Sequence, residues 1–497
     1  MAHSVKSAGR LDWSRVRFTP NLDENIARMN EIFQNDNTLN QRLLICRADP
    51  TIRCALFYFD GMVNASVINE SLAEPVLCYQ GPPVDADELA TKVLEIRNSH
   101  VESDAWKALS SMMSGDTLVF VDGDSRPVVG DTKGYSLRSV DEPDNERVLQ
   151  GPREGFNENM MTNLSLIRRR LKTPDFKCSF RYFGTETHTV ASVCYIEGLC
   201  DQSVLAEFQR RLDRFDLDSA LDANYLIECC RDAPLSPFPT MGVTERPDIV
   251  AAKLLEGRVA LVLDGTPVAI TAPHLLLESF QTNDDYYLSF FYTNVSRLLR
   301  ILGFFLTILA PAVYLALVQH HPEMVPTRLL LSISASTEGV PLPALFEALL
   351  LLIIFEILKE TGLRTPSGIG QALSIVGGLV LGQAAVEARF VSAPMVIVIA
   401  FAGTTALMVP KLKTASLLLR FVLLIAAAAL GLYGVFLVCA LVLLHVCGLS
   451  TFGVPYLTNI ISVRADDLRD VYLRFPWFSM KRDKRFLAGN GADEEDG

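Results

Sequence analysis

The sequence predicts a soluble α/β head of two related subdomains, followed by an all-α polytopic membrane domain with five or six transmembrane helices. Three observations predict this fold class. Charged and apolar residues are mixed before about residue 297, and long apolar runs follow it. The first part contains a repeated strand–turn–helix pattern. Several of the later runs approach the roughly 20 apolar residues that cross a bilayer.

The head contains two pairs of similar segments. Residues 55–61 (ALFYFDG) resemble 192–198 (SVCYIEG), and residues 115–123 (GDTLVFVDG) resemble 257–265 (GRVALVLDG). Each is an apolar strand that ends in an acidic residue and a glycine, a common turn signal. Because both pairs occur in the same order at similar spacing, we interpret the head as two related units. Chance similarity of a common pattern is the alternative.

The chain is divided accordingly into five parts. These are an N-terminal extension (1–39), a first α/β subdomain (40–145), a second with a connecting helix (146–290), a transmembrane domain (291–460), and a tail that is basic and then acidic (461–497). The connecting helix ends in Arg168, Arg169 and Arg170. These arginines form either a solvated helix face or a site for anionic lipid or an acidic partner.

Composition excludes several function classes. The formal net charge of −12 leaves no electrostatic footprint for nucleic acid. The ten cysteines form no CxxC pair and histidines number only seven, so we expect no metal site. No catalytic constellation and no phosphate- or dinucleotide-binding motif is present, so neither an enzyme nor a cofactor is expected. Residues 1–20 lack an export signal, which predicts a cytosolic head with reduced thiols.

The apolar runs predict the membrane spans. The candidates are 298–319, 341–358, 369–386, 392–409 and a long stretch at 415–449, which forms either a hairpin or one tilted helix. Residues 320–340 are too polar to cross and predict a surface or re-entrant helix. Basic residues flank the spans and fill the tail, and Arg389 alone falls in the outer loop between the third and fourth spans. The positive-inside rule therefore favours six crossings with both termini in the cytosol over five.

Two acidic residues lie within the second predicted span. Glu347 is about two turns inside it, and Glu356 is nearer its cytosolic end. A carboxylate at the centre of a membrane helix costs roughly 2.5–3.5 kcal/mol on insertion scales, so both are expected to face protein or water. Each has either a functional role or a structural one, in a salt bridge or at the membrane surface.

Small and polar residues mark the third predicted span. Gly370, Ser374, Gly378 and Gly382 recur every four residues, with Gln371 and Gln383 beside them. Such a stripe permits close helix packing. It also suits a narrow pore, in which an apolar ring stops ions by excluding water. The residues alone leave these alternatives open.

Several motifs in this order resemble the GerA family of spore germination proteins, specifically its A subunit. In the membrane domain they are 321–327 (HPEMVPT), 338–343 (EGVPLP), 370–378 (GQALSIVGG), 382–388 (GQAAVEA) and 452–456 (FGVPY). In the head they are 151–154 (GPRE), 163–170 (NLSLIRRR), 245–248 (ERPD) and 256–258 (EGR). The resemblance covers nearly the whole chain after about residue 20.

The resemblance implies a multi-pass protein of the spore inner membrane, or of the cell membrane, with a cytosolic head. It implies two partners, a transporter-like B subunit that binds the germinant and a lipoprotein C subunit. It also implies a homo-oligomeric ring around a channel that releases cations when nutrient is sensed. The third span then lines the pore, with Val376, Leu379 and Val380 as candidate gate residues. A proton-coupled transporter using Glu347 and a non-conducting scaffold are the alternatives.

Overall fold

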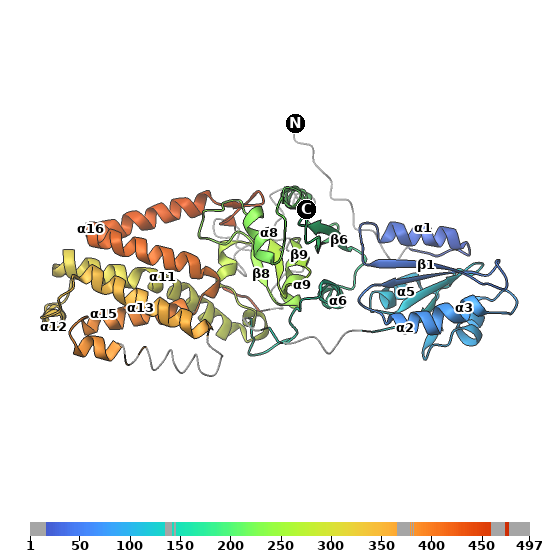
Figure 1. Cartoon of the computed structure of the whole chain (residues 1–497), viewed down its shortest axis with the longest axis horizontal. Coiled ribbons are helices and arrows are strands. Elements are labelled where there is room, and N and C mark those ends of the chain that lie inside the picture. Colours follow the sequence, from blue (N-terminus) through green and yellow to red (C-terminus); the bar gives the residue numbers. More distant parts are fainter. Residues whose placement is uncertain are drawn as a thin grey trace, which may run out of the picture.

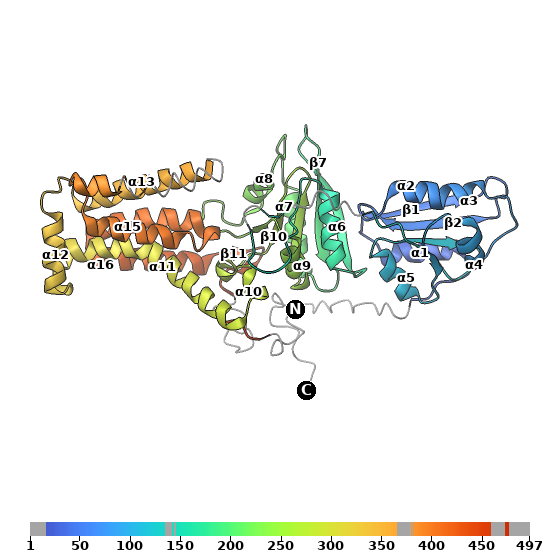
Figure 2. The same cartoon turned by 90° about the horizontal axis from the view of Figure 1, so that it is seen from below.

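Three parts follow one another along the long axis of the molecule (Figures 1 and 2). Two α/β units form one half, and a bundle of long helices forms the other. The structure is a computed structural model. It describes residues 16–134, 142–143, 146–364, 378, 380, 382–458 and 473–476.

The first unit is a five-stranded antiparallel sheet covered on both faces by helices. The strands are β1 (Leu39–Ile45), β2 (Arg53–Phe59), β3 (Ser99–Val101), β4 (Thr117–Val121) and β5 (Val128–Gly130), in the order β1-β2-β4-β5-β3. One face packs on α1 (Leu22–Ile32) and α5 (Ala105–Met112). The other packs on the helical stretch from α2 (Ala65–Val67) through α3 (Glu74–Cys78), and on α4 (Ala86–Glu88).

The sequence of strand β2 is a nearly continuous apolar run because both faces of the sheet are covered. Phe57 points into one core and Leu56 into the other, so successive side chains of a strand are both buried. Helix α1 falls within the stretch assigned to an N-terminal extension. Its residues Leu22 and Met29 nevertheless belong to the core of the first unit.

The second unit repeats this topology. Its strands are β6 (Phe176–Phe183), β7 (Thr189–Ile196), β8 (Gly242–Thr244), β9 (Val259–Leu263) and β10 (Ala269–Ala272), in the order β6-β7-β9-β10-β8. Helices α6 (Met160–Arg170) and α9 (Pro247–Leu255) cover one face. Helices α7 (Gln202–Leu212) and α8 (Ala223–Cys230) cover the other. The two sheets therefore have the same strand order, position for position.

A buried arginine joins the two units. Arg168 of α6 donates to the carboxylate of Asp36 at 2.6 Å and stacks on the ring of Phe59, with 3.9 Å between the guanidinium carbon and the ring centroid. Arg170 pairs with Glu154 at 2.6 Å. The arginine run is therefore not a uniform solvated face, because Arg168 is fully buried at the contact between the units.

The helical half begins with α11 (Phe290–His320), followed by α12 (Thr327–Thr337), α13 (Ala344–Arg364), α15 (Ala393–Ala406) and α16 (Lys413–Gly448). Two helical stretches of the described chain are long and apolar enough to cross a membrane, at Phe290–His320 and Pro410–Gly448. Helix α12 lies at the end of the bundle farthest from the head (Figure 2).

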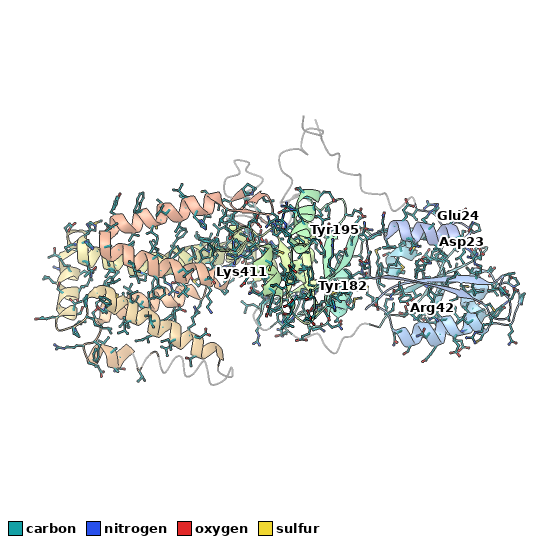
Figure 3. All side chains as sticks on the ribbon, turned by 45° about the horizontal axis from the view of Figure 1, so that its top comes forward. Asp23, Glu24, Arg42, Tyr182, Tyr195 and Lys411 are labelled. Carbon is teal, nitrogen blue, oxygen red and sulfur yellow. The ribbon has the colours of Figure 1, made fainter. Side chains whose placement is uncertain are left out.

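The stretch α16 folds back on itself. Gly431 has φ +62° and ψ −143°, outside the helical region. A Cβ at Gly431 would lie 2.9 Å from that of His320, the last residue of α11. By contrast, Lys411 before α16 donates to the Gln281 carbonyl at 3.3 Å, and His445 near its end contacts Ser236 Oγ at 2.9 Å. Both ends of α16 thus lie at the head, where Lys411 is seen in Figure 3, and its middle lies at the far end.

The two glycines that flank β9 provide a test of the second unit. Gly257 and Gly265 have left-handed φ values of +85° and +86°. A Cβ at Gly257 would lie 2.5 Å from the carbonyl oxygen of Leu199, whereas one at Gly265 meets nothing within 4 Å. We expect Gly265→Ala to lower the unfolding free energy by about 1–2 kcal/mol through backbone strain alone. Gly257→Ala should cost clearly more, because it adds a clash. Denaturant unfolding of the two variants measures the difference, and equal losses would contradict the packing described.

Candidate functional site at the junction of the head and the long helices

The chain passes from the head into the helical half without a flexible linker. After β10 come a 3₁₀ turn, η5 (Leu276–Phe280), and the short helix α10 (Asp284–Tyr287). Helix α11 starts three residues later, at Phe290. Any displacement of α10 must therefore move the first turn of α11.

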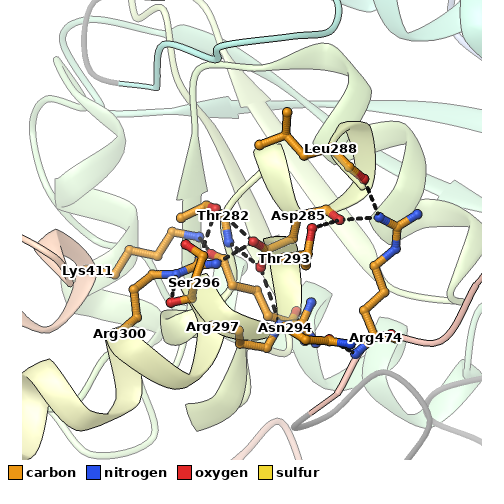
Figure 4. Close-up of polar contacts among 11 residues, drawn as sticks. Thr282, Asp285, Leu288, Thr293, Asn294, Ser296, Arg297, Arg300, Lys411 and Arg474 are labelled. Atoms are coloured by element: carbon orange, nitrogen blue, oxygen red, sulfur yellow. Dashed lines mark hydrogen bonds and ion pairs between the residues drawn. The ribbon is translucent and has the colours of Figure 1, made fainter. Parts of the chain in front are cut away.

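A buried carboxylate fixes α10 to α11. Asp285 is only 2% exposed, and its Oδ2 accepts from Arg297 Nε at 3.3 Å. Its Oδ1 pairs with Arg300 (Figure 4). Arg297 and Arg300 are three residues apart and so face the same side of α11. Arg300 also donates to Thr282 Oγ1 at 2.8 Å, and Thr293 Oγ1 donates to the Asp285 carbonyl at 3.1 Å.

A segment from near the C-terminus joins this cluster. Arg474 donates to the carbonyl oxygens of Asp285 and Leu288 at 2.5 and 3.0 Å. Its backbone N–H donates to Asn294 Oδ1 at 2.7 Å, and its carbonyl accepts from the same side chain at 3.1 Å (Figure 4). The head, the first long helix and the C-terminal segment therefore meet at one point.

A second buried network lies on the head side of the junction. Glu278 of η5 pairs with Arg258 and Lys253, each at 2.6 Å, and with His274 at 3.2 Å. Burial alone raises the pKa of Glu278, but the charges of Arg258 and Lys253 outweigh it and hold this pKa well below its ordinary value. Burial lowers the pKa of His274. Glu278 is therefore ionised and His274 neutral at pH 7.

The last helix returns to the same unit of the head. Tyr456 donates to the Pro239 carbonyl at 2.8 Å, and Thr451 donates to the Thr240 carbonyl at 2.6 Å. Phe452 enters the apolar core of the second unit, where the guanidinium of Arg211 lies 4.4 Å from its ring centroid. The start of α11 and the end of α16 are thus both anchored to the second unit.

Comparison with known proteins identifies the family. The family described as "Bacillus/Clostridium GerA spore germination protein" matches residues 27–486. The chain belongs to the GerA family.

Named relatives agree with this assignment. Spore germination protein KA of Bacillus subtilis is 38% identical over 93% of this chain and 86% of its own length. Spore germination protein B1 of the same species is 34% identical, over 87% of this chain and 90% of its own length. A solved crystal structure, the N-terminal domain of the A subunit of the Bacillus megaterium spore germinant receptor GerK3, is 29% identical, with a TM-score of 0.40. The match between the two structures covers 52% of this chain and 98% of the crystallised domain.

In this GerA chain, the two predicted membrane acids have protein partners. Glu347 is buried, and its Oε1 accepts from the backbone N–H of Ser392 at 2.5 Å and from its hydroxyl at 2.6 Å. Ser392 is the N-cap of α15, so Glu347 supplies an acceptor at a helix N-terminus, where the first N–H groups lack partners within the helix. Glu356 pairs with Arg420 of α16 at 2.9 Å and with Lys359 at 3.5 Å.

The predicted pore segment is described only in part. Of the candidate pore-lining residues that the structure describes, two face the protein and two face outward. Two glycines face the protein, because a Cβ added at Gly378 would lie 3.9 Å from Leu358 of α13, and one added at Gly382 would lie 3.9 Å from Val396 of α15. Val380 is 57% exposed, and Gln383 is exposed as well. The remaining candidates lie outside the described residues: Gly370, Gln371, Ser374, Val376 and Leu379.

Several residues of the GerA junction were not predicted from sequence. The sequence places Arg297 and Arg300 at the flank of the first apolar run and gives no sign of their partner Asp285. Glu278 and Arg474 were missed because their partners are distant in the chain. Within the described residues, no group of three or more His, Cys, Asp or Glu is arranged to hold a metal ion.

The Asp285 cluster gives a first prediction at this site. Asp285→Asn removes the carboxylate that neutralises two buried arginines, so we expect it to lower the unfolding free energy by about 3–5 kcal/mol. The matched control is Asp284→Asn, since the adjacent Asp284 is only partly buried and, among the described residues, accepts from the Leu149 N–H and pairs with no arginine. Thermal melting of the solubilised chain compares the two variants. Equal shifts would show that the Asp285 pairs do not hold the junction.

The Glu356–Arg420 pair gives a second prediction. Glu356→Gln leaves the buried Arg420 guanidinium without its counter-charge, and we expect a loss of about 3–5 kcal/mol. The double variant Glu356→Leu, Arg420→Leu removes both charges together and should recover most of that loss. Melting temperatures of the solubilised variants measure both effects. A double variant as unstable as Glu356→Gln would argue against a purely structural pair.

Proposed function

We propose that this chain is the membrane A subunit of a spore nutrient germinant receptor, and that copies of it assemble as a ring around a ligand-gated cation channel. Membership of the GerA family and the identity with spore germination proteins KA and B1 over most of the chain support this assignment. In this proposal the chain acts in the spore inner membrane with a transporter-like B subunit and a lipoprotein C subunit.

The observation that carries the channel proposal is a polar face on the outside of the bundle. Gln383 donates to Glu387 at 3.0 Å, and both side chains are exposed, one turn beyond the exposed Val380. Exposed apolar residues suit lipid, but the exposed amide of Gln383 lies inside the predicted span and requires protein or water, and Glu387 lies just beyond the outer end of that span. A water-filled axis shared by several copies satisfies this requirement, while Gly378 and Gly382 pack the segment onto α13 and α15.

The course of the helices supports six crossings with the head on the cytosolic side. The hairpin at Gly431 returns the chain to the head, so that the long stretch α16 crosses twice. Helix α11 leads away from the head, and α12 lies at the far end (Figure 2). Both ends of the helical half are then on the side of the head, as the basic flanks require.

The contacts of Glu347 favour a channel over the alternative of a proton-coupled transporter. Its Oε1 is committed to the N-cap residue Ser392, and the side chain is buried against it. A proton carrier needs a carboxylate that water can reach, whereas Glu347 is enclosed by protein at the N-terminus of α15.

Thiol modification during current recording tests the channel. The chain is reconstituted in planar bilayers with B and C subunits, after replacement of the exposed Cys78, Cys229 and Cys447 by serine. We expect nutrient to evoke a cation current, and a charged methanethiosulfonate to abolish most of it in Val380→Cys, because Val380 faces the aqueous axis.

The control for this experiment is Ile397→Cys, on α15. Ile397 is 68% exposed, comparable with Val380, but lies on an entirely apolar stretch that suits lipid. The reagent should leave its current unchanged. Absence of any nutrient-evoked current, or equal block of the two cysteine variants, would contradict the proposed pore.

A further inference from the structure

A cavity of about 520 Å³ lies where the head meets the helical half. Its walls come from β8, α9 and α10 of the head, and from the turn η7 (Pro410–Leu412) that joins α15 to α16. Much of the lining is apolar, including Met241, Val243, Ile249 and Tyr286. Its volume falls in the range of roughly 300–1,000 Å³ typical of sites for small molecules.

Most charges in the cavity wall are neutralised by partners within the protein. Glu278 pairs with Arg258 and Lys253, as described above. Asp248 pairs with Arg246 at 2.7 Å and accepts from the hydroxyl of Tyr287. These groups form closed networks and need no ligand.

Two charged side chains of the cavity wall, Glu146 and Lys411, contact neutral groups instead of an opposite charge. Glu146 of the head accepts from the Thr244 hydroxyl and from the Glu245 N–H at 3.0 Å, which are neutral donors, and Arg246 contacts its backbone carbonyl instead. Among the described residues, Lys411 of η7 donates to the Gln281 carbonyl alone, at 3.3 Å. In the part of the chain that the structure describes, neither has an opposite charge within 4.0 Å. Figures 3 and 4 show Lys411 at this boundary.

We propose that this cavity binds a compact zwitterion, with its anionic group beside Lys411, its ammonium beside Glu146 and an apolar body against Met241 and Ile249. The remaining charges of the wall are balanced, so a ligand with one charge of each sign completes the site without leaving an excess. A ligand of this kind bridges the head and η7, and therefore links the second unit to the start of α16.

A free amino acid and the head group of phosphatidylethanolamine share this chemistry. The first reaches the cavity from water, and the second from the membrane surface next to η7. The proposal goes beyond channel activity and is independent of it, because binding is measured without current. Failure of either proposal therefore leaves the other standing.

The test for a free zwitterion uses the full chain in detergent micelles and isothermal titration calorimetry with L-leucine. Two probes each lack one charge, 4-methylpentanoate without the ammonium and 3-methylbutylamine without the carboxylate. We expect saturable binding of leucine, and binding weaker by about tenfold or more for each probe and for Lys411→Met and Glu146→Gln. Lys413→Met, which removes a nearby lysine outside the cavity lining, is the matched control and should bind as the unaltered chain does.

The test for a lipid uses the same variants in nanodiscs that contain phosphatidylethanolamine and phosphatidylcholine. Native mass spectrometry then measures retained lipid. Retention of phosphatidylethanolamine by the unaltered chain and by Lys413→Met, but not by Lys411→Met, supports the site with a lipid source. If leucine does not bind and lipid retention is the same in all variants, the proposal is overturned. Leucine binding that is unaffected by both Lys411→Met and Glu146→Gln overturns it as well.

Discussion

The carboxylate of Asp285, buried between Arg297 and Arg300, is the contact on which the connection between head and helices depends. Burying these charges away from water is costly, and the cost is offset only while the carboxylate stays in contact with both guanidinium groups. The cluster therefore resists gradual displacement: α10 and α11 move together or the charges separate. Arg474 adds the C-terminal segment to the same constraint through the carbonyl oxygen of Asp285.

Buried arginine–carboxylate pairs also lie at two other interfaces of the molecule. Arg168 pairs with Asp36 where the two α/β units meet, and Arg420 pairs with Glu356 between α16 and α13. Each pair joins residues that are distant in the chain, and each arginine is buried. A displacement of the head thus has a path to the bundle through contacts with defined geometry. The second unit is central to this path, because it holds both the start of α11 and the end of α16.

The sequence predicted those features that depend on local patterns. The apolar strands with acidic-glycine ends are predicted from neighbouring residues, and they are present. For the stretch 415–449 the sequence leaves a hairpin and a single tilted helix open, and the structure shows a break at Gly431. Partners such as Asp36 and Arg168 could not be predicted, because 132 residues separate them. The glycines of the third span show the same limit. Their spacing indicates a close-packed face, but only the fold shows that Gly378 and Gly382 face α13 and α15 while Val380 and Gln383 face outward.

The Asp285 cluster holds the head at a fixed position relative to the bundle. Pulsed electron paramagnetic resonance tests it most directly, with spin labels at the exposed Leu255 on α9 and the exposed Leu329 on α12. We expect a single narrow distance distribution for the otherwise unaltered chain, and a broad one when Asp285→Asn is added. Equally narrow distributions in the two proteins would contradict it.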